Sequence, residues 1–131
     1  MSRILLFVYG TLKRGLSNHR RLEGQSLVGE ATTKDAYQLW DLGPFPALTK
    51  EGPEPSRING ELYEIDQGCL DSCDLLEGHP NFYKRFKITV EVGGVACKAW
   101  CYFILQRHRV EHAKPITESW VRIPLPAYYH G

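Results

Sequence analysis

Apolar and polar positions along this chain predict several short strands. The strand expected at residues 4–9 begins with five apolar residues, a run too short to cross a membrane and typical of a strand buried on both faces. A short helix is expected near residues 18–22. Further strand-like runs lie at 26–33, 36–41, 47–49 and 59–65. Glycines and prolines at 43–46 and 51–55 separate the later runs with turns.

The clearest pattern is a hairpin over residues 85–105. Apolar residues alternate with charged or polar ones along its first strand, and a Gly-Gly pair follows as a two-residue turn. Placing Val92 opposite Val95 across this turn puts Phe86 opposite Cys101. The hairpin is therefore predicted to have one continuous apolar face.

One segment, residues 67–77, shows the period of an α-helix. Many short strands with one substantial helix predict an α+β domain, built as a curled sheet or a small barrel. The 131 residues are expected to form a single domain, 1–131. Prolines predict an irregular C-terminal tail at 107–131, whose aromatic residues could pack over the body as a lid. These aromatic residues are Trp120, Tyr128 and Tyr129.

The charge balance argues against polyanionic partners. Sixteen basic and fifteen acidic side chains leave a net charge of +1. Neither nucleic acid nor an anionic membrane is therefore an expected partner. The apolar run near Met1 lacks the length of a secretory signal, so the expected location is cytoplasmic. The oligomeric state stays unknown at this point.

The four cysteines are expected to be free thiols in a reducing compartment. Cys97 and Cys101 are separated by about 13 Å along a strand, which is beyond the reach of a disulfide. No C-x-x-C pair indicates a zinc or redox site. His108 and His112 have the spacing of two ligands on one helix face. Without an H-E-x-x-H pattern, an exposed basic turn is expected there and no metal site.

A glycine-bracketed loop, residues 10–15, follows the first strand. Backbone N–H groups at the carboxyl end of a buried strand can form a cradle for a small anion. A nucleotide-binding P-loop is disfavoured because Leu16-Ser17 stand where that motif needs lysine and a hydroxyl residue. Two interpretations stay open, an ordinary turn and a site for an anion smaller than a polyphosphate. His19, close to this loop in sequence, is a further candidate for substrate binding.

Glu77 is the candidate acid or base. It falls at the edge of the apolar stripe of the predicted helix, whereas Asp71 and Asp74 project outside that stripe. A partly desolvated carboxylate at the last turn of a helix has a raised pKa, which suits a general base near neutral pH. The alternative is a glutamate at a frayed helix end before Gly78. No pattern of a serine or cysteine hydrolase accompanies it.

Short motifs spread over roughly residues 4–105 carry a family resemblance. They are Tyr9-Gly10-Thr11-Leu12-Lys13-Arg14-Gly15, Asn18-His19, Phe45-Pro46-Ala47, Gly60-Glu61-Leu62-Tyr63, and Asp74-Leu75-Leu76-Glu77 followed by Pro80, Tyr83 and Arg85. Together they resemble the γ-glutamylcyclotransferase-like superfamily, and especially its γ-glutamylamine cyclotransferase branch. The chain departs from relatives at Cys73, where leucine is common, and in the proline-rich stretch 44–55.

The resemblance implies a small mixed β-barrel flanked by short helices. It implies that the α-amine of a γ-glutamyl amine, such as γ-glutamyl-ε-lysine, attacks the γ-carbonyl of the same molecule. The products are 5-oxoproline and a free amine, and no metal or organic cofactor is required. Glu77 is the implied acid/base. The implied substrate-binding residues are Tyr9, Gly10, Thr11, Leu12, Asn18 and Tyr83.

Other functions are compatible with the same residues. The substrate could be a different γ-glutamyl amide, including an intermediate of a biosynthetic pathway. A non-catalytic protein that binds a γ-glutamyl ligand is the main alternative from another class. A hydrolase that uses water in place of the substrate amine is the third.

Overall fold

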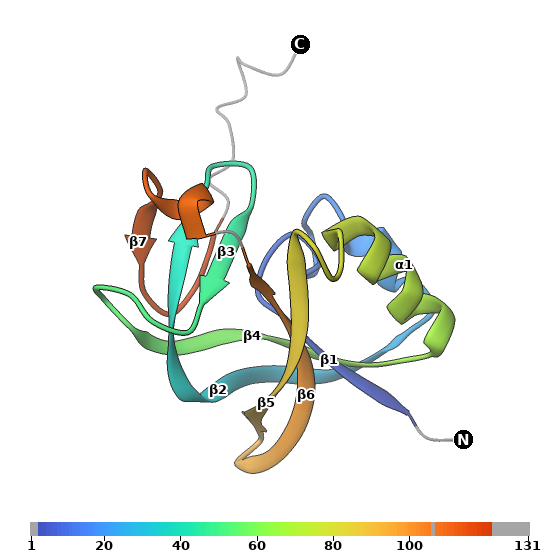
Figure 1. The fold of residues 1–131 in the computed structure, drawn as a ribbon. Helices are drawn as coiled ribbons and strands as arrows, with labels where there is room; N and C mark the ends of the chain where they lie inside the picture. Colours follow the sequence, from blue (N-terminus) through green and yellow to red (C-terminus); the bar gives the residue numbers. More distant parts are fainter. Residues whose placement is uncertain (1–2, 106, 122–131) are drawn as a thin grey trace, which may run out of the picture.

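A computed structural model describes residues 3–105 and 107–121 of the chain, and its centre is a closed barrel of five strands (Figure 1). The strands pair in the order β2 (Ser26–Asp41), β4 (Ser56–Ile65), β1 (Ile4–Val8), β6 (Val95–Ile104) and β5 (Tyr83–Val92). The barrel closes where Thr32 and Thr33 of β2 pair with Glu91 and Val90 of β5. Only the β1–β6 pair is parallel, so the barrel is mixed as expected.

Two short strands extend the barrel at one end. β3 (Pro46–Thr49) and β7 (Lys114–Ile116) pair with the two edges of the last part of β2. The helix α1 (Gln67–Glu77) lies on the other side of the molecule, beside the 3₁₀ turn η1 (His19–Leu22) (Figure 1). A second 3₁₀ turn, η2 (Arg107–Val110), precedes β7.

The first strand is buried on both faces, as its apolar run predicts. Leu6 and Val8 face a core cluster that includes Leu70 and Cys73 of α1. Phe7, between them, faces a second cluster that fills the barrel. Because both faces are covered, the loop that follows β1 leaves the barrel from a fixed point.

Close backbone contact explains one glycine beside this strand. A Cβ atom at Gly60 would lie 2.3 Å from the carbonyl oxygen of Val8 and 2.7 Å from the ring of Phe7. Any side chain at this position would push β4 away from β1.

The hairpin and the helix agree with the sequence expectations. Val92 pairs with Val95 and Phe86 with Cys101, and α1 has the predicted bounds. Asp66 caps the start of the helix by accepting a hydrogen bond from the N–H of Cys69 at 2.7 Å.

Two expectations about regular structure were wrong. The runs at 26–33 and 36–41 belong to one strand, β2, with an irregularity between Thr32 and Ala36 that keeps the strand continuous while it bends. The tail is not irregular from residue 107, because η2 and β7 lie within it. Pro115 of β7 lies opposite Trp40 of β2, because proline is tolerated in a short edge strand.

The expected lid lies only partly within the described residues. Trp120 is buried in the core cluster of the barrel and so packs into the body of the protein. Tyr128 and Tyr129 lie outside the described residues. All four cysteines are free thiols, and Cys97 is half-buried while the other three are buried. Among the described helices, none is long and apolar enough to cross a membrane.

Candidate active site

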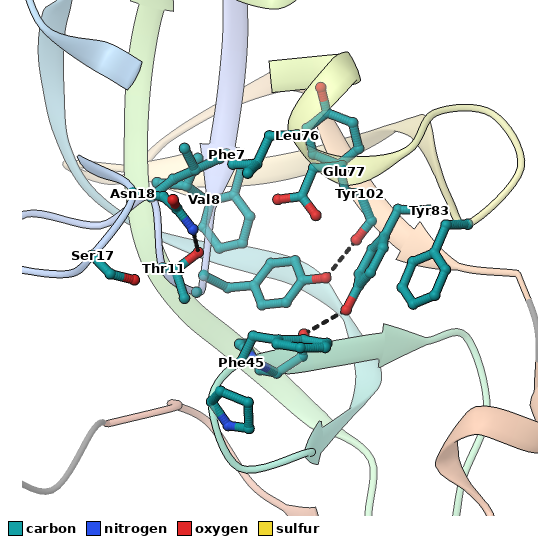
Figure 2. A pocket seen from close by; sticks show the side chains of 16 residues that line it. Phe7, Val8, Thr11, Ser17, Asn18, Phe45, Leu76, Glu77, Tyr83 and Tyr102 are labelled. Carbon is teal, nitrogen blue, oxygen red and sulfur yellow. Dashed lines mark hydrogen bonds between the residues drawn. The ribbon is translucent and has the colours of Figure 1, made fainter. Parts of the chain in front are cut away.

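A cavity of about 390 Å³ opens where β1 ends. Its walls come from the loop after β1, the start of β3, the end of α1, the start of β5 and the end of β6 (Figure 2). The cavity brings together all the residues that the family resemblance assigned to the site, but not His19. These residues are Tyr9, Gly10, Thr11, Leu12, Asn18, Glu77 and Tyr83.

Hydrogen bonds fix the shape of the loop after β1. Asn18 donates to the hydroxyl of Thr11 from its side chain at 2.9 Å and to the carbonyl of Thr11 from its backbone at 3.0 Å. Arg14 donates to Glu61 of β4 from its backbone N–H at 2.9 Å and from Nε at 3.2 Å. Asn18 therefore braces the loop that lines the cavity, in addition to lining it.

The loop also has backbone N–H groups that no hydrogen bond within the described residues uses. Within the described residues, no hydrogen bond uses the N–H groups of Gly10, Thr11 or Leu12. All three residues line the cavity. A Cβ atom at Gly10 would lie 2.9 Å from Cγ of Pro46, so glycine lets β3 approach the loop closely. This arrangement fits the anion cradle that the sequence suggested.

Glu77 is the last residue of α1. Gly78, with a left-handed φ of 67°, ends the helix immediately after it. Figure 2 shows the carboxylate of Glu77 in the cavity, between Thr11 and Asn18 on one side and Tyr83 on the other. No hydrogen bond from another described residue reaches this carboxylate. The helix end is not frayed, because the N–H of Gly78 caps it by donating to the carbonyl oxygens of Asp74 and Leu75.

Burial sets the protonation of Glu77. Desolvation raises the pKa of Glu77 to about 7, and the positive charge of Arg21 opposes the rise only in part. The raised pKa expected from the helix pattern is thus confirmed. At neutral pH the side chain can both accept and release a proton.

Asp74, one turn before Glu77, connects α1 to the barrel. Its two carboxylate oxygens accept hydrogen bonds from Nε and Nη2 of Arg85 at 2.9 and 3.1 Å. The hydroxyl of Tyr102 donates to the same carboxylate at 2.6 Å. The guanidinium of Arg85 in turn stacks on Trp100, 4.4 Å from the ring centroid. The helix end is thereby held against both β5 and β6.

Tyrosine hydroxyls around the cavity are used to hold the walls together. Tyr9 donates to the carbonyl oxygen of Tyr102 at 2.6 Å, and Tyr83 donates to that of Pro46 at 2.8 Å. Burial raises the pKa of both tyrosines, and the nearby charge of Glu77 adds to the rise. These hydroxyls therefore stay protonated, and they offer a ligand their lone pairs and ring faces.

Several lining residues were not identified as site residues from the sequence. They are Phe7, Val8, Ser17, Pro44, Phe45, Pro46, Leu76, Phe82 and Tyr102. Tyr102 could have been identified from the sequence, because the predicted hairpin register places it opposite Arg85, a residue of the family motif. His19 donates from Nδ1 to the carbonyl oxygen of Leu12 at 3.0 Å, and it does not line the cavity.

Metal ligands were also considered. The described residues contain no group of three or more histidine, cysteine or acidic side chains placed to hold a metal ion. The side chain of His108 is outside what the structure describes. The expectation of a basic turn at His108 and His112 therefore stays a prediction.

Comparison with known proteins identifies the family. The family model described as gamma-glutamyl cyclotransferase, AIG2-like, matches residues 6–122. The chain belongs to this family. Within it, the sequence is 41% identical over 106 residues to a Vibrio cholerae protein that bears the provisional name gamma-glutamylcyclotransferase, covering 81% of this chain and 86% of that protein.

Other members of the gamma-glutamyl cyclotransferase family support the assignment. The gamma-glutamylaminecyclotransferase of Bos taurus is 32% identical over 126 residues, covering 91% of this chain and 71% of the bovine protein. The crystal structure of an AIG2-like protein from Mus musculus superposes with a TM-score of 0.72 at 28% identity, covering 79% of this chain and 78% of the mouse chain. The five-stranded barrel with α1 is thus a fold that this chain shares with its relatives.

Replacing Asp74 by asparagine tests the connection between α1 and the barrel. Asp74→Asn removes the negative charge that accepts hydrogen bonds from both Arg85 and Tyr102. We expect the free energy of unfolding to fall by about 2–3 kcal/mol, measured by urea denaturation. Asp71→Asn is the matched control, since Asp71 is exposed on the same helix and, among the residues that the structure describes, accepts a hydrogen bond only from Gln67. Equal effects of the two variants would contradict this role.

Glu77→Gln is expected to stabilise the protein at alkaline pH. Because the pKa of Glu77 is raised from 4.5 to about 7 on folding, the folded state binds a proton that the unfolded chain has released in this window. Stability therefore falls as pH rises from 4.5 to 7, by up to about 3 kcal/mol. Urea denaturation should show a gain for Glu77→Gln at pH 8 and little change at pH 4.5.

The exposed Glu23→Gln provides a control for the loss of one negative charge and should show no such pH dependence. A gain for Glu77→Gln of the same size at both pH values would mean that improved packing, and not removal of a buried charge, causes the effect.

Proposed function

We propose that this protein is a cyclotransferase that converts a γ-glutamyl amine to 5-oxoproline and a free amine, with Glu77 as general acid and base. The observation that carries the proposal is the isolated carboxylate of Glu77, with a pKa of about 7, facing a loop of open backbone donors across one cavity. The family membership supports γ-glutamyl cyclotransfer as the reaction class.

The two charged groups of the γ-glutamyl moiety match the two sides of the cavity. The α-carboxylate would accept hydrogen bonds from the N–H groups of Gly10, Thr11 and Leu12. The α-ammonium would lie toward Glu77, with the lone pairs of Tyr9 and Tyr83 available nearby. This orientation folds the substrate so that its amine approaches its own γ-carbonyl.

In the reaction, Glu77 accepts a proton from the α-ammonium and exposes the nitrogen lone pair. The nitrogen attacks the γ-carbonyl carbon, and a five-membered ring closes through a tetrahedral intermediate. If two of the three loop N–H groups hold the α-carboxylate, the third can stabilise the oxyanion, where the loss of one donor typically costs about 3 kcal/mol. Glu77 then gives this proton to the leaving nitrogen as its bond to carbon breaks. The α-nitrogen loses a second proton as it becomes the lactam N–H, and the released amine takes up that proton and departs as an ammonium.

Positioning is expected to be the largest catalytic contribution. Holding the amine and the carbonyl in a near-attack geometry can supply roughly 7–11 kcal/mol. This explains why the site needs no serine or cysteine nucleophile, because the nucleophile belongs to the substrate. Water is not consumed, since the substrate amine takes the place of water.

A protein that only binds a γ-glutamyl ligand is the alternative from another class. A binding protein would hold the α-ammonium best with a carboxylate that stays ionised, whereas a pKa of about 7 suits a group that accepts and releases a proton. The raised pKa of Glu77 therefore favours the enzyme over the binding protein.

We expect Glu77→Gln to lose at least about 100-fold in kcat while ligand binding is retained, because a general base typically contributes that much or more. The measurement is 5-oxoproline release, by mass spectrometry, from γ-glutamyl-ε-lysine and a panel of other γ-glutamyl compounds. Glu23→Gln should turn over like the wild type.

Each outcome separates the candidate functions. Full turnover by Glu77→Gln would remove Glu77 from the mechanism. Free glutamate in place of 5-oxoproline would identify a hydrolase. Binding without turnover across the panel would identify a non-catalytic protein.

The rate should also depend on pH through Glu77. Since only the ionised carboxylate accepts the proton of the ammonium, kcat/KM should rise about 100-fold from pH 5 to pH 8 and level off above the pKa of about 7. Steady-state kinetics across this range, on protein checked for folding at each pH, provide the test. A flat profile would contradict a base with this pKa.

A further inference from the structure

We propose that Trp120 is a positioning residue for the candidate active site, because it anchors two separate loops that line the cavity. One is the loop after β1, and the other is the β2–β3 loop, residues 42–45. Thr11 and Phe45 mark these two loops in Figure 2. The inference rests on the proposed cyclotransferase function and adds to it a residue that acts without touching the substrate.

The loop after β1 is anchored through Lys13. Nζ of Lys13 donates to the carbonyl oxygen of Trp120 at 2.9 Å. Lys13 directly follows Leu12, the last of the three cavity residues with open backbone N–H groups. Burial lowers the pKa of Lys13, although the charge of Glu61 opposes this shift. The ammonium is thus partly desolvated, which strengthens its hydrogen bond to the carbonyl.

The β2–β3 loop is anchored through the indole of the same residue. Nε1 of Trp120 donates to Oδ1 of Asp41 at 3.1 Å, and the backbone N–H of Gly43 donates to the same oxygen at 2.8 Å. Gly43, Pro44 and Phe45 are all exposed, so packing restrains them little. The conformation of this turn therefore depends on Asp41, which Trp120 holds in place.

Trp120 can anchor both loops because the barrel sets its own position. Its side chain is buried in the core cluster that fills the barrel. The segment before it is held against β4, since the N–H of Asn59 donates to the carbonyl of Glu118 at 2.7 Å and the N–H of Glu118 donates to Oγ of Ser56 at 2.8 Å. A displacement of Trp120 should therefore move both loops together.

Close packing makes the alignment of the two loops important for the reaction. A Cβ atom at Gly10 would lie 2.9 Å from Cγ of Pro46, the residue that follows the β2–β3 loop. A shift of either loop should therefore displace the backbone N–H groups that begin at Gly10. A misplacement of about 1 Å in a positioning group can cost about 100-fold in rate.

Two variants each remove one of the anchoring hydrogen bonds. Lys13→Met removes the ammonium, and Trp120→Phe removes the indole N–H while an aromatic side chain is retained. We expect each to lower kcat/KM for 5-oxoproline release from γ-glutamyl-ε-lysine at least about tenfold. The pH at which kcat/KM levels off should stay that of the wild type, because Glu77 lies on α1 and takes no part in these bonds.

Rescue and control variants separate positioning from general destabilisation. Asp41→Asn keeps Oδ1 as an acceptor and should keep the wild-type kcat/KM, whereas Asp41→Ala should behave like Trp120→Phe. Trp40→Phe is the matched control, since the indole N–H of Trp40 donates to Oγ1 of Thr49, at the end of β3 away from the β2–β3 loop. Lys98→Met controls for the loss of a lysine charge, because Lys98 is exposed on β6. Both controls should turn over like the wild type.

Amide hydrogen exchange tests the anchoring without turnover. The N–H of Asn18 donates to the loop after β1 at 3.0 Å, and the N–H of Leu42 donates across the β2–β3 loop at 3.1 Å. Exchange should rise at least about tenfold at Asn18 in Lys13→Met and at Leu42 in Trp120→Phe. Trp120→Ala should raise it at both positions.

The outcomes distinguish this inference from the proposed function. Wild-type kcat/KM in both Lys13→Met and Trp120→Phe, or an equal loss in Trp40→Phe, would overturn the positioning role while leaving cyclotransfer intact. Unchanged exchange at Asn18 and Leu42 would overturn the anchoring itself. Absence of 5-oxoproline from the wild type across the γ-glutamyl panel would overturn the proposed function, and with it any role of Trp120 in turnover.

Discussion

The paired hydrogen bonds between Asp74 and Arg85 determine where the candidate acid/base stands. Glu77 lies one helical turn beyond Asp74, so any rotation or shift of α1 moves the carboxylate relative to the loop after β1. Tyr102 adds a third hydrogen bond to Asp74, and its own carbonyl accepts the hydroxyl of Tyr9. The side chain of Asp74 is thus connected through Tyr102 of β6 to Tyr9 in the wall across the cavity.

The site combines side chains with opposite effects on stability. Asp74 has its pKa lowered despite partial desolvation, because Arg85 and Tyr102 donate to it, and it stabilises the fold as an anion. Glu77 is desolvated without such donors, and as an anion it opposes folding. Two carboxylates three residues apart therefore have different roles because one faces the barrel strands and the other faces the cavity.

The sequence predicts those parts of the fold that depend on local pattern. The β5–β6 hairpin follows from alternation and a Gly-Gly turn, and the position of Glu77 follows from helical periodicity. Closure of the barrel between β2 and β5 could not be predicted, because it depends on how far the irregularity after Thr32 bends β2. The edge strand β7 was also missed, since proline composition does not show that a free strand edge is available.

The same limit applies to the site. Tyr9 to Leu12 and Glu77 stand out locally, because each belongs to a pattern readable within a few residues. Phe82 contributes to the cavity only after α1, β5 and β6 have been packed together, and its apolar character alone does not distinguish it from a core residue. The loop residues and the candidate acid/base were thus easier to identify from the sequence than the apolar residues that line the rest of the cavity.

The hydrogen bond between Lys13 and Trp120 forms late during synthesis of the chain. Nζ of Lys13, in the loop after β1, donates to the carbonyl oxygen of Trp120 at 2.9 Å, across 107 positions of sequence. The loop leaves the ribosome early, and its anchor is among the later residues to emerge. At about 5–20 residues per second this interval lasts roughly 5–20 s. During that time the nascent chain carries the loop without its hydrogen bond to Trp120, so the loop gains this contact only after residue 120 has been added.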